Sequence, residues 1–160
     1  MKEIVLLSKK MKLKNFQIIL TIIIMINFQK LKLEMKDGVP CYSPGLDIIR
    51  VPQKSQFISL DHYYATLFHE MVHSTGHETR LKRDLRGKFG TQSYAREELV
   101  AEMGSAFLCC NSHIDKPEIT TNKAAYIQSW SKKIKDDPKL FVIAASRAEA
   151  AVRFILGEEI

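Results

Sequence analysis

The segment HEMVH at positions 69–73 contains the residue types of a metal-dependent hydrolytic centre. On a helix, His69 and His73 lie four residues apart on one face, so both imidazoles can bind the same zinc ion. Glu70 is offset by one residue, which lets its carboxylate reach a water at the metal rather than the metal itself. Zinc lowers the pKa of such a water toward neutrality, and a nearby carboxylate can take its proton and later return it to a leaving amine. The pattern predicts hydrolysis, with Glu70 as the general base.

A catalytic zinc ion also needs a third protein ligand and an open coordination position. In the arrangement HExxHxxGxxH, the third ligand would be a histidine at position 79. Gly76 is in place, but residue 79 is Thr79, and His77 directly follows the glycine. The third ligand must therefore come from another part of the chain.

The segment REELVAEMGSAF, starting at position 96, supplies glutamates for this role. Glu98 and Glu102 share one face of a helix because they are four residues apart. We assign Glu98 to the metal and Glu102 to a ligating histidine, whose proton it would accept to fix the ring tautomer. The reverse assignment of these two glutamates is the alternative. Glu97 points about 100° away on the helix and is the weaker choice.

Other polar residues near the motif have two interpretations each. His77 either lines the cleft beside the metal ligands or caps the end of the helix. Tyr94 and Tyr126 either donate to a developing oxyanion or belong to the core. His62 and His113 are lone histidines, so structural roles are expected for both. A basic cluster after the motif is either a solvated loop or a surface for an acidic or phosphate-bearing partner; it comprises Arg80, Lys82, Arg83, Arg86 and Lys88.

A helix is needed around the motif, and the flanking residues predict one. Ser59 is suited to be its N-cap, with Asp61 in the first turn. Apolar residues recur at helical spacing and predict a buried stripe; they are Leu67, Phe68, Met71 and Val72. Gly76 is placed to end the helix in a left-handed cap.

Three further helices and a pair of strands are predicted. One helix covers about 94–110, with Ser93 as its cap and an apolar side of Leu99, Met103, Ala106 and Phe107. The next begins at Thr121 or Asn122 and ends at Asp137-Pro138; its core face is Tyr126, Ile127, Trp130 and Ile134. The last runs from about 139 to 156 and stops at Gly157. Upstream of the motif, LKLEMKDGVPCYSPGLDIIRVP predicts two antiparallel strands separated by turns.

Composition is that of one folded domain. The chain has 160 residues, of which 46% are hydrophobic and 26% charged. The net charge of +6 comes from the N-terminal 36 residues, so it gives no reason to expect nucleic-acid binding by the rest. Three cysteines, Cys41, Cys109 and Cys110, form no CxxC pair and indicate free thiols in a reducing cytoplasm.

The N-terminal segment stands apart from the rest of the chain. We divide the chain into a basic and apolar extension, residues 1–36, and a metallopeptidase-like domain, residues 37–160. Within the extension, FQIILTIIIMINF at 16–28 is too short to cross a bilayer comfortably and lacks a signal-peptide cleavage site. It is interpreted as a strand or other core element, as a membrane-associated segment, or as an atypical, non-native start of the chain.

Four stretches resemble one known family. GVPCYSPGLDIIRVPQKSQF, YYATLFHEMVHSTGHETRLKRDL, YAREELVAEMGSAFL and AAYIQSWSKKIKDDPKLFVIAASRAEAAVRFILG are similar to the zincin-like metallopeptidase domain of the ArdC antirestriction and plasmid-primase-associated family. The resemblance covers about residues 37–157. Its most specific parts are the HExxHxTGHxxRL and EELVAE stretches.

This resemblance implies an α+β zincin fold, a small antiparallel sheet packed on helices with the HExxH helix central. It also supports Glu98 as third ligand, and it implies carriage on plasmids or other mobile elements. Family members often have a separate N-terminal domain that binds single-stranded DNA, for which this chain leaves no room. We therefore expect no DNA binding, a protein or peptide substrate of unknown identity, and no membrane partner.

Three hypotheses follow from the sequence. The first is a zinc metallopeptidase-like hydrolase with the metal on His69, His73 and Glu98. The second is a non-catalytic antirestriction or binding module with a structural zinc site. The third is a membrane-tethered protease anchored by residues 16–28.

Overall fold

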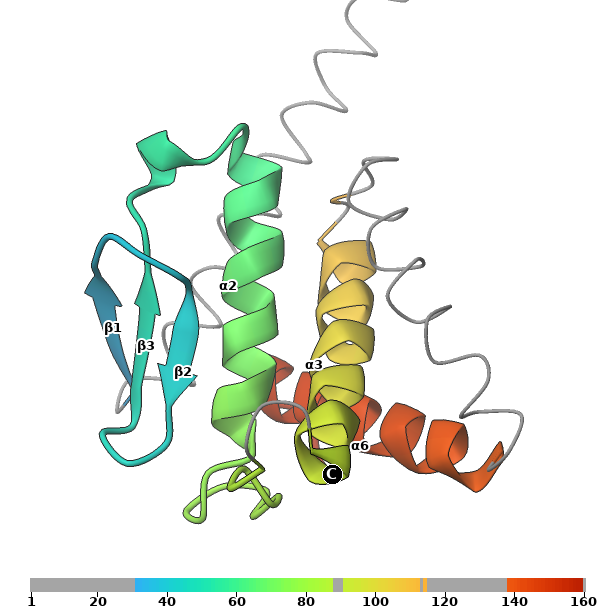
Figure 1. Cartoon of the computed structure of the whole chain (residues 1–160). Helices are drawn as coiled ribbons and strands as arrows, with labels where there is room; N and C mark the ends of the chain where they lie inside the picture. The colour runs from blue at the N-terminus through green and yellow to red at the C-terminus, as the bar shows by residue number, and fades with distance from the viewer. Residues whose placement is uncertain (1–30, 88–90, 113, 115–137, 160) are drawn as a thin grey trace, which may run out of the picture.

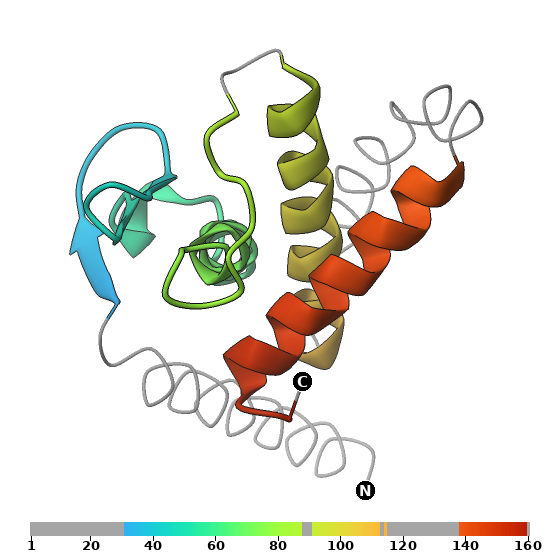
Figure 2. The same cartoon turned by 90° about the horizontal axis from the view of Figure 1, so that it is seen from below.

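The computed structural model describes residues 31–87, 91–112, 114 and 138–159. Within these ranges the element order is β1 (Lys32–Met35), β2 (Cys41–Ser43), β3 (Ile48–Val51), η1 (Lys54–Gln56), α2 (Leu60–Thr75), α3 (Gln92–Asn111) and α6 (Pro138–Leu156). Helix α2 lies between the sheet and α3 (Figure 1), and α6 packs across α3 (Figure 2). The fold is α+β with the HExxH helix central, as predicted.

Several predicted features lie outside the described residues. They are the apolar run 16–28, His113, Tyr126, Lys88 and the helix expected from Thr121 or Asn122 onward. In the described ranges, no helix combines the length and apolar character needed to cross a membrane. The three cysteines are free thiols, as expected.

The sheet is mixed, not wholly antiparallel as expected, and has the order β1-β3-β2. Strands β2 and β3 form the predicted antiparallel hairpin, in which Tyr42 pairs with Ile49. Strand β1 runs parallel to β3, so part of the segment assigned to the N-terminal extension belongs to the sheet. Ile49 and Val51 are buried and packed in the main core. Strand β2 is a sheet edge within the described residues, and its residues Cys41 and Tyr42 line the cavity described below.

Helix α2 begins where the sequence predicts but ends differently. The Ser59 side chain accepts a hydrogen bond from the His62 backbone N–H, and the His62 ring contacts the same hydroxyl at 2.8 Å. At the other end, Gly76 has φ −74°, so the predicted left-handed cap is wrong. The lack of a side chain at Gly76 instead leaves room for the returning loop. A Cβ on Gly76 would lie 2.8 Å from the Cδ2 atom of Leu85 and 3.2 Å from the guanidinium of Arg83.

Helix α3 departs from the prediction at its start and along its apolar side. Thr91, not Ser93, is the N-cap, and its hydroxyl accepts from the Tyr94 N–H. Leu99 is buried as predicted, but Phe107 is 40% exposed. The buried side continues through residues that the predicted stripe omitted, Val100, Gly104, Ser105 and Leu108. Helix α6 runs from Pro138 to Leu156 and is followed by Gly157 at φ 73°, in agreement with the prediction.

Helices α2 and α3 approach closely at Gly104. A Cβ at this position would lie 2.8 Å and 3.0 Å from the two methyl carbons of Val72, and the shorter distance is closer than real Cβ contacts allow. One residue on, the buried Ser105 hydroxyl donates to the Ala65 carbonyl of α2 at 2.8 Å. The small residue and the hydroxyl together fix the separation of the two helices.

We expect the substitution Gly104→Ala to destabilise the fold by up to about 2 kcal/mol. Alanine gains about 1 kcal/mol of helix propensity over glycine, but overpacking against the stiff Val72 side chain costs more, typically about 1–3 kcal/mol. Urea unfolding of the metal-free protein measures the difference. The control is Gly104→Ala introduced together with Val72→Ala, where the added methyl has room and should be neutral or stabilising. An equal effect of Gly104→Ala in both backgrounds would contradict this packing argument.

Candidate metal centre

Three side chains from α2 and α3 converge between the helices. One ligand atom from each of His69, His73 and Glu98 lies within 4.8 Å of the other two. The Nε2 atoms of the two histidines are 3.1 Å apart, and the Glu98 carboxylate oxygens lie 3.5 Å and 3.4 Å from them. The structure therefore brings together the three residues that the sequence analysis assigned to the metal.

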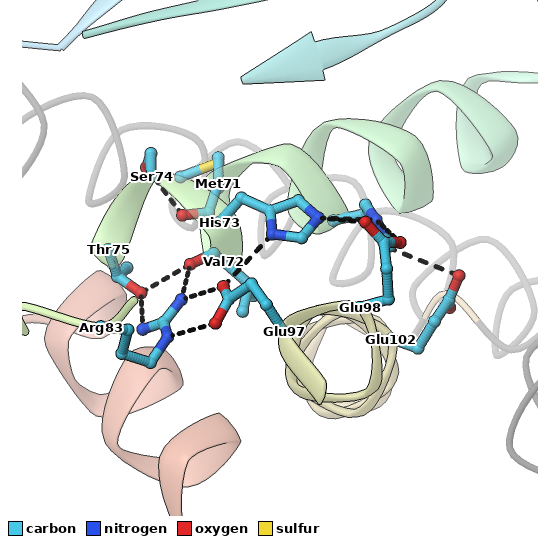
Figure 3. Close-up of polar contacts among 10 residues, drawn as sticks. Met71, Val72, His73, Ser74, Thr75, Arg83, Glu97, Glu98 and Glu102 are labelled. Carbon is cyan, nitrogen blue, oxygen red and sulfur yellow. Dashed lines mark hydrogen bonds and ion pairs between the residues drawn. The ribbon is translucent and has the colours of Figure 1, made fainter. Parts of the chain in front are cut away.

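Carboxylates also contact the outer nitrogens of both imidazoles. The Nδ1 atom of His73 is 3.2 Å from Oε1 of Glu97 (Figure 3). The Nδ1 atom of His69 is 3.5 Å from Oε1 of Glu102. An ionised carboxylate only accepts hydrogen bonds, so the contact with Glu97 favours a proton on Nδ1 of His73, and the longer contact with Glu102 favours the same tautomer of His69. In the neutral imidazoles the Nε2 lone pairs then point toward one another, which is the arrangement that a shared cation stabilises.

Glu97 is the residue near the histidines that the sequence analysis set aside. Its side chain is buried and contacts His73. Glu102, for which a histidine contact was predicted, contacts His69. The prediction assumed that only one face of α3 could reach the histidines. In the structure, the adjacent residues Glu97 and Glu98 contact opposite sides of the His73 ring, at Nδ1 and Nε2.

Arg83 is the second residue that the sequence did not identify. Only 5% of its side chain is exposed, although it belongs to the basic cluster interpreted as a solvated loop or partner surface. Its Nε and Nη2 atoms donate to the two Glu97 carboxylate oxygens at 3.0 Å and 2.8 Å. It also donates to the Thr75 hydroxyl and the Val72 carbonyl at the end of α2 (Figure 3). For Arg83 both predicted roles are wrong, because the loop folds back on the helix.

Glu70 lies beside the histidine pair and is 7% exposed. Burial raises the pKa of its carboxyl group, while the nearby His69 and His73 and a hydrogen bond from the Tyr42 backbone act to lower it. Helix α2 and strand β2 therefore both position this carboxyl group. A carboxyl group with a raised pKa is better matched to accept and return a proton near neutral pH.

The charged groups of the cluster shift the pKa of His73 upward and the pKa values of Glu97 and Glu98 downward. Burial acts to lower the pKa of His73, but hydrogen bonds to Glu97 and Glu98 outweigh it and raise the pKa to about 9. Burial acts to raise the pKa of both glutamates. Hydrogen bonds from His73 and Arg83 hold the pKa of Glu97 below its ordinary value, and those from His69 and His73 do the same for Glu98. The cluster therefore attracts positive charge to the space between the two rings.

A cavity of about 330 Å³ opens onto this cluster. One wall is Pro40, Cys41, Tyr42 and Pro44, around strand β2. The lining also includes Leu85 from the loop after α2 and Tyr94 from the start of α3. Tyr94 is thus at the cavity, as one of its two predicted roles requires. In the described part of the chain, no lysine or arginine lines this cavity.

His77 does not join the cluster. Its Nδ1 atom contacts the Thr79 hydroxyl at 2.8 Å, and the residue lines a separate hollow with Lys82 and Arg86. The chain leaves the helix after Gly76, which carries His77 away from the face that holds His69 and His73. The expected position beside the metal ligands is therefore not observed.

Comparisons with curated proteins find relatives that are much longer than this chain. Two proteins named DNA primase TraC from Escherichia coli are 43% and 41% identical over 118 residues, which cover 74% of this chain but 11% and 8% of the primases. A protein named y4eC from Sinorhizobium fredii is 37% identical over 108 residues, 68% of this chain and 35% of y4eC. The chain thus spans about a tenth of the primases and a third of y4eC.

Solved structures with the same fold include the antirestriction protein ArdC from plasmid R388. Its Mn(II)-bound structure aligns with a TM-score of 0.68 and 37% identity, over 79% of this chain and 47% of that one. Its metal-free structure aligns with a TM-score of 0.63 and 32% identity, over 86% and 51% of the two chains. The profile of the zincin-like metallopeptidase family associated with polyvalent proteins matches residues 24–147. The chain belongs to this zincin-like metallopeptidase family, as the HExxH and EELVAE stretches indicated.

Proposed function

We propose that this chain is a zinc-dependent, metallopeptidase-like hydrolase domain in which His69, His73 and Glu98 hold the metal and Glu70 is the general base. The observation that supports it most directly is the convergence of two imidazole nitrogens and one carboxylate within 4.8 Å, beside a second, buried carboxyl group, that of Glu70. This donor set matches that of catalytic zinc sites with two histidines, one glutamate and an open position.

The choice of metal rests on the chemistry of the donors. ArdC of R388 binds Mn(II) in its solved structure, which supports a divalent cation in the related domain. Imidazole nitrogens suit zinc and other late transition metals, whereas carboxylates and waters suit magnesium and calcium. With two imidazoles among three protein ligands, we propose Zn²⁺ as the functional ion.

The residues around the ligands divide the chemistry of amide hydrolysis between them. When bound, Zn²⁺ supplies a Lewis acid that polarises a carbonyl group and acidifies the attacking water. Glu70 accepts the proton of that water on its carboxylate and delivers it to the leaving amine. The Tyr42 backbone N–H keeps the carboxylate oriented from the sheet side. Glu97 and Glu102 hold the imidazoles by their Nδ1 protons, which leaves the Nε2 atoms for the metal.

A second candidate function is inhibition of a host defence enzyme by binding, with the metal as a structural element. The observation in its favour is the 37% identity to a protein described as an antirestriction protein. In this case the ligands would stabilise the packing of α2 on α3, and Glu70 would have no chemical role. The two candidates differ in what they require of Glu70.

Metal analysis should find about one zinc ion per chain. We expect Glu98→Ala and His73→Ala to abolish stoichiometric binding, because each removes a ligand atom. The matched control is Glu102→Ala, which removes a carboxylate one turn away on the same helix and should weaken affinity only about 10- to 100-fold. Chelator-competition titrations measure all of these affinities. A greater loss of zinc affinity in Glu102→Ala than in Glu98→Ala would show that Glu102 is the ligand and Glu98 its neighbour. An unmodified chain that binds no zinc would refute the proposal.

The substitution Glu70→Gln separates the two candidates. Glutamine keeps the shape and the acceptor for the Tyr42 N–H but cannot take a proton. We expect hydrolysis of a peptide library by the zinc-loaded protein to fall about 10²- to 10⁴-fold, with the zinc content unchanged. Antirestriction assays on the same variant provide the second readout. Full antirestriction activity in Glu70→Gln, with no hydrolysis by the unmodified chain, would favour the binding module.

A further inference from the structure

Arg83 links the two helices that hold the metal ligands. Its guanidinium group donates to the Val72 carbonyl and the Thr75 hydroxyl at the end of α2, at 2.6 Å and 2.7 Å. The same group forms a two-pronged contact with the Glu97 carboxylate on α3. A buried guanidinium with acceptors on two helices fixes both of them relative to the loop that carries it.

The position of Glu97 gives this linkage a direct route to the metal centre. Its Oε1 atom accepts from Arg83 and also faces Nδ1 of His73, at 2.8 Å and 3.2 Å. Glu97 is also the residue before Glu98, so an interaction that holds Glu97 restrains the α3 backbone at the proposed ligand. His73 and Glu98 therefore both depend on where Glu97 lies.

We propose that Arg83 is a positioning residue of the metal centre: it holds Glu97, which in turn fixes the His73 ring with Nε2 toward His69 and Glu98. This inference rests on the proposed function, because it concerns how tightly the site binds its metal. Arg83 does not itself touch the metal or the substrate in this scheme. Its effect passes through one carboxylate and one imidazole.

Arginine is specifically suited to this task. Its planar fork matches the two oxygens of a carboxylate, and its remaining N–H groups reach other acceptors at the same time. A lysine at position 83 keeps the charge but is a single flexible donor centre that cannot make the two-pronged contact. Glu97 would then be free to rotate, and with it the His73 ring.

Arg80 offers a matched control in the same loop. It is also mostly buried, with an 11% exposed side chain, and it also binds the end of α2, through the Ser74 carbonyl at 2.7 Å. Its other acceptors are the Asp47 carboxylate and the Tyr42 hydroxyl of the hairpin, rather than a carboxylate that holds a metal-binding histidine. Replacement of either arginine should loosen the loop, but only one should alter the metal site.

The experiment compares Arg83→Lys and Arg80→Lys by zinc affinity and by the visible spectrum of bound Co²⁺. We expect Arg83→Lys to weaken zinc binding about 10- to 100-fold, as loss of a partner behind a ligating histidine does. Its Co²⁺ bands should shift because the ligand geometry relaxes. Arg80→Lys should lower the unfolding midpoint of the metal-free protein by about as much as Arg83→Lys does. It should nevertheless change zinc affinity less than about threefold.

A second variant keeps the test decisive if Arg83→Lys does not fold. Glu97→Gln removes the charge between Arg83 and His73 while preserving volume, and it should also weaken zinc binding about tenfold or more. Parent-like zinc affinity and Co²⁺ spectra in folded Arg83→Lys or Glu97→Gln would overturn the role of Arg83 and leave the metal site standing. Equal loss of zinc affinity in Arg80→Lys would show a general effect of the loop and would also overturn it. Absence of zinc binding by the unmodified chain would overturn both proposals together.

Discussion

The backbone of α3 can approach α2 at Gly104 because no side chain stands between it and Val72. This contact sets how far a side chain on α3 must reach to meet the histidines on α2. Glu98 lies nearly two turns before Gly104 on the same helix, and it spans the gap to both Nε2 atoms without any contribution from a third element. If the helices were further apart, His69 and His73 would still share a face of α2, but the carboxylate would no longer complete the site.

The loop after α2 also holds α2 and α3 together, at the end of α2. It returns toward the helix at Gly76, where the lack of a side chain makes room for Leu85 and Arg83. Arg80 then ties the loop to the β2–β3 hairpin through Asp47, while Arg83 ties it to α3 through Glu97. The sheet, α2 and α3 are thus connected by two guanidinium groups three residues apart. Both are buried because their hydrogen-bond acceptors are the last carbonyls of α2 and carboxylates on neighbouring elements.

The sequence predicted what depends on local geometry. The spacing of His69 and His73, the Ser59 cap and the choice of Glu98 with Glu102 all follow from the repeat of a single helix. It did not predict features that depend on how elements meet. Glu97 was set aside because a helical wheel gives a direction relative to one helix, not the place of a second. Arg83 belonged to a charged stretch that is typical of a solvated loop, and only the path of that loop brings it to Glu97. The parallel pairing of β1 with β3 likewise has no local signal.

The balance of charge explains why this cluster suits a divalent cation. Four carboxyl groups surround the two imidazoles, those of Glu70, Glu97, Glu98 and Glu102. Arg83 offsets the charge of Glu97, which leaves an excess of negative charge around the Nε2 atoms. In the metal-free chain a proton on His73 neutralises part of that negative charge, and the pKa of His73 rises to about 9 although burial opposes it. A divalent cation held by neutral imidazoles would neutralise more of the charge and would release that proton. The carboxylates that contact the rings would therefore also supply the electrostatic attraction for a metal ion bound between them.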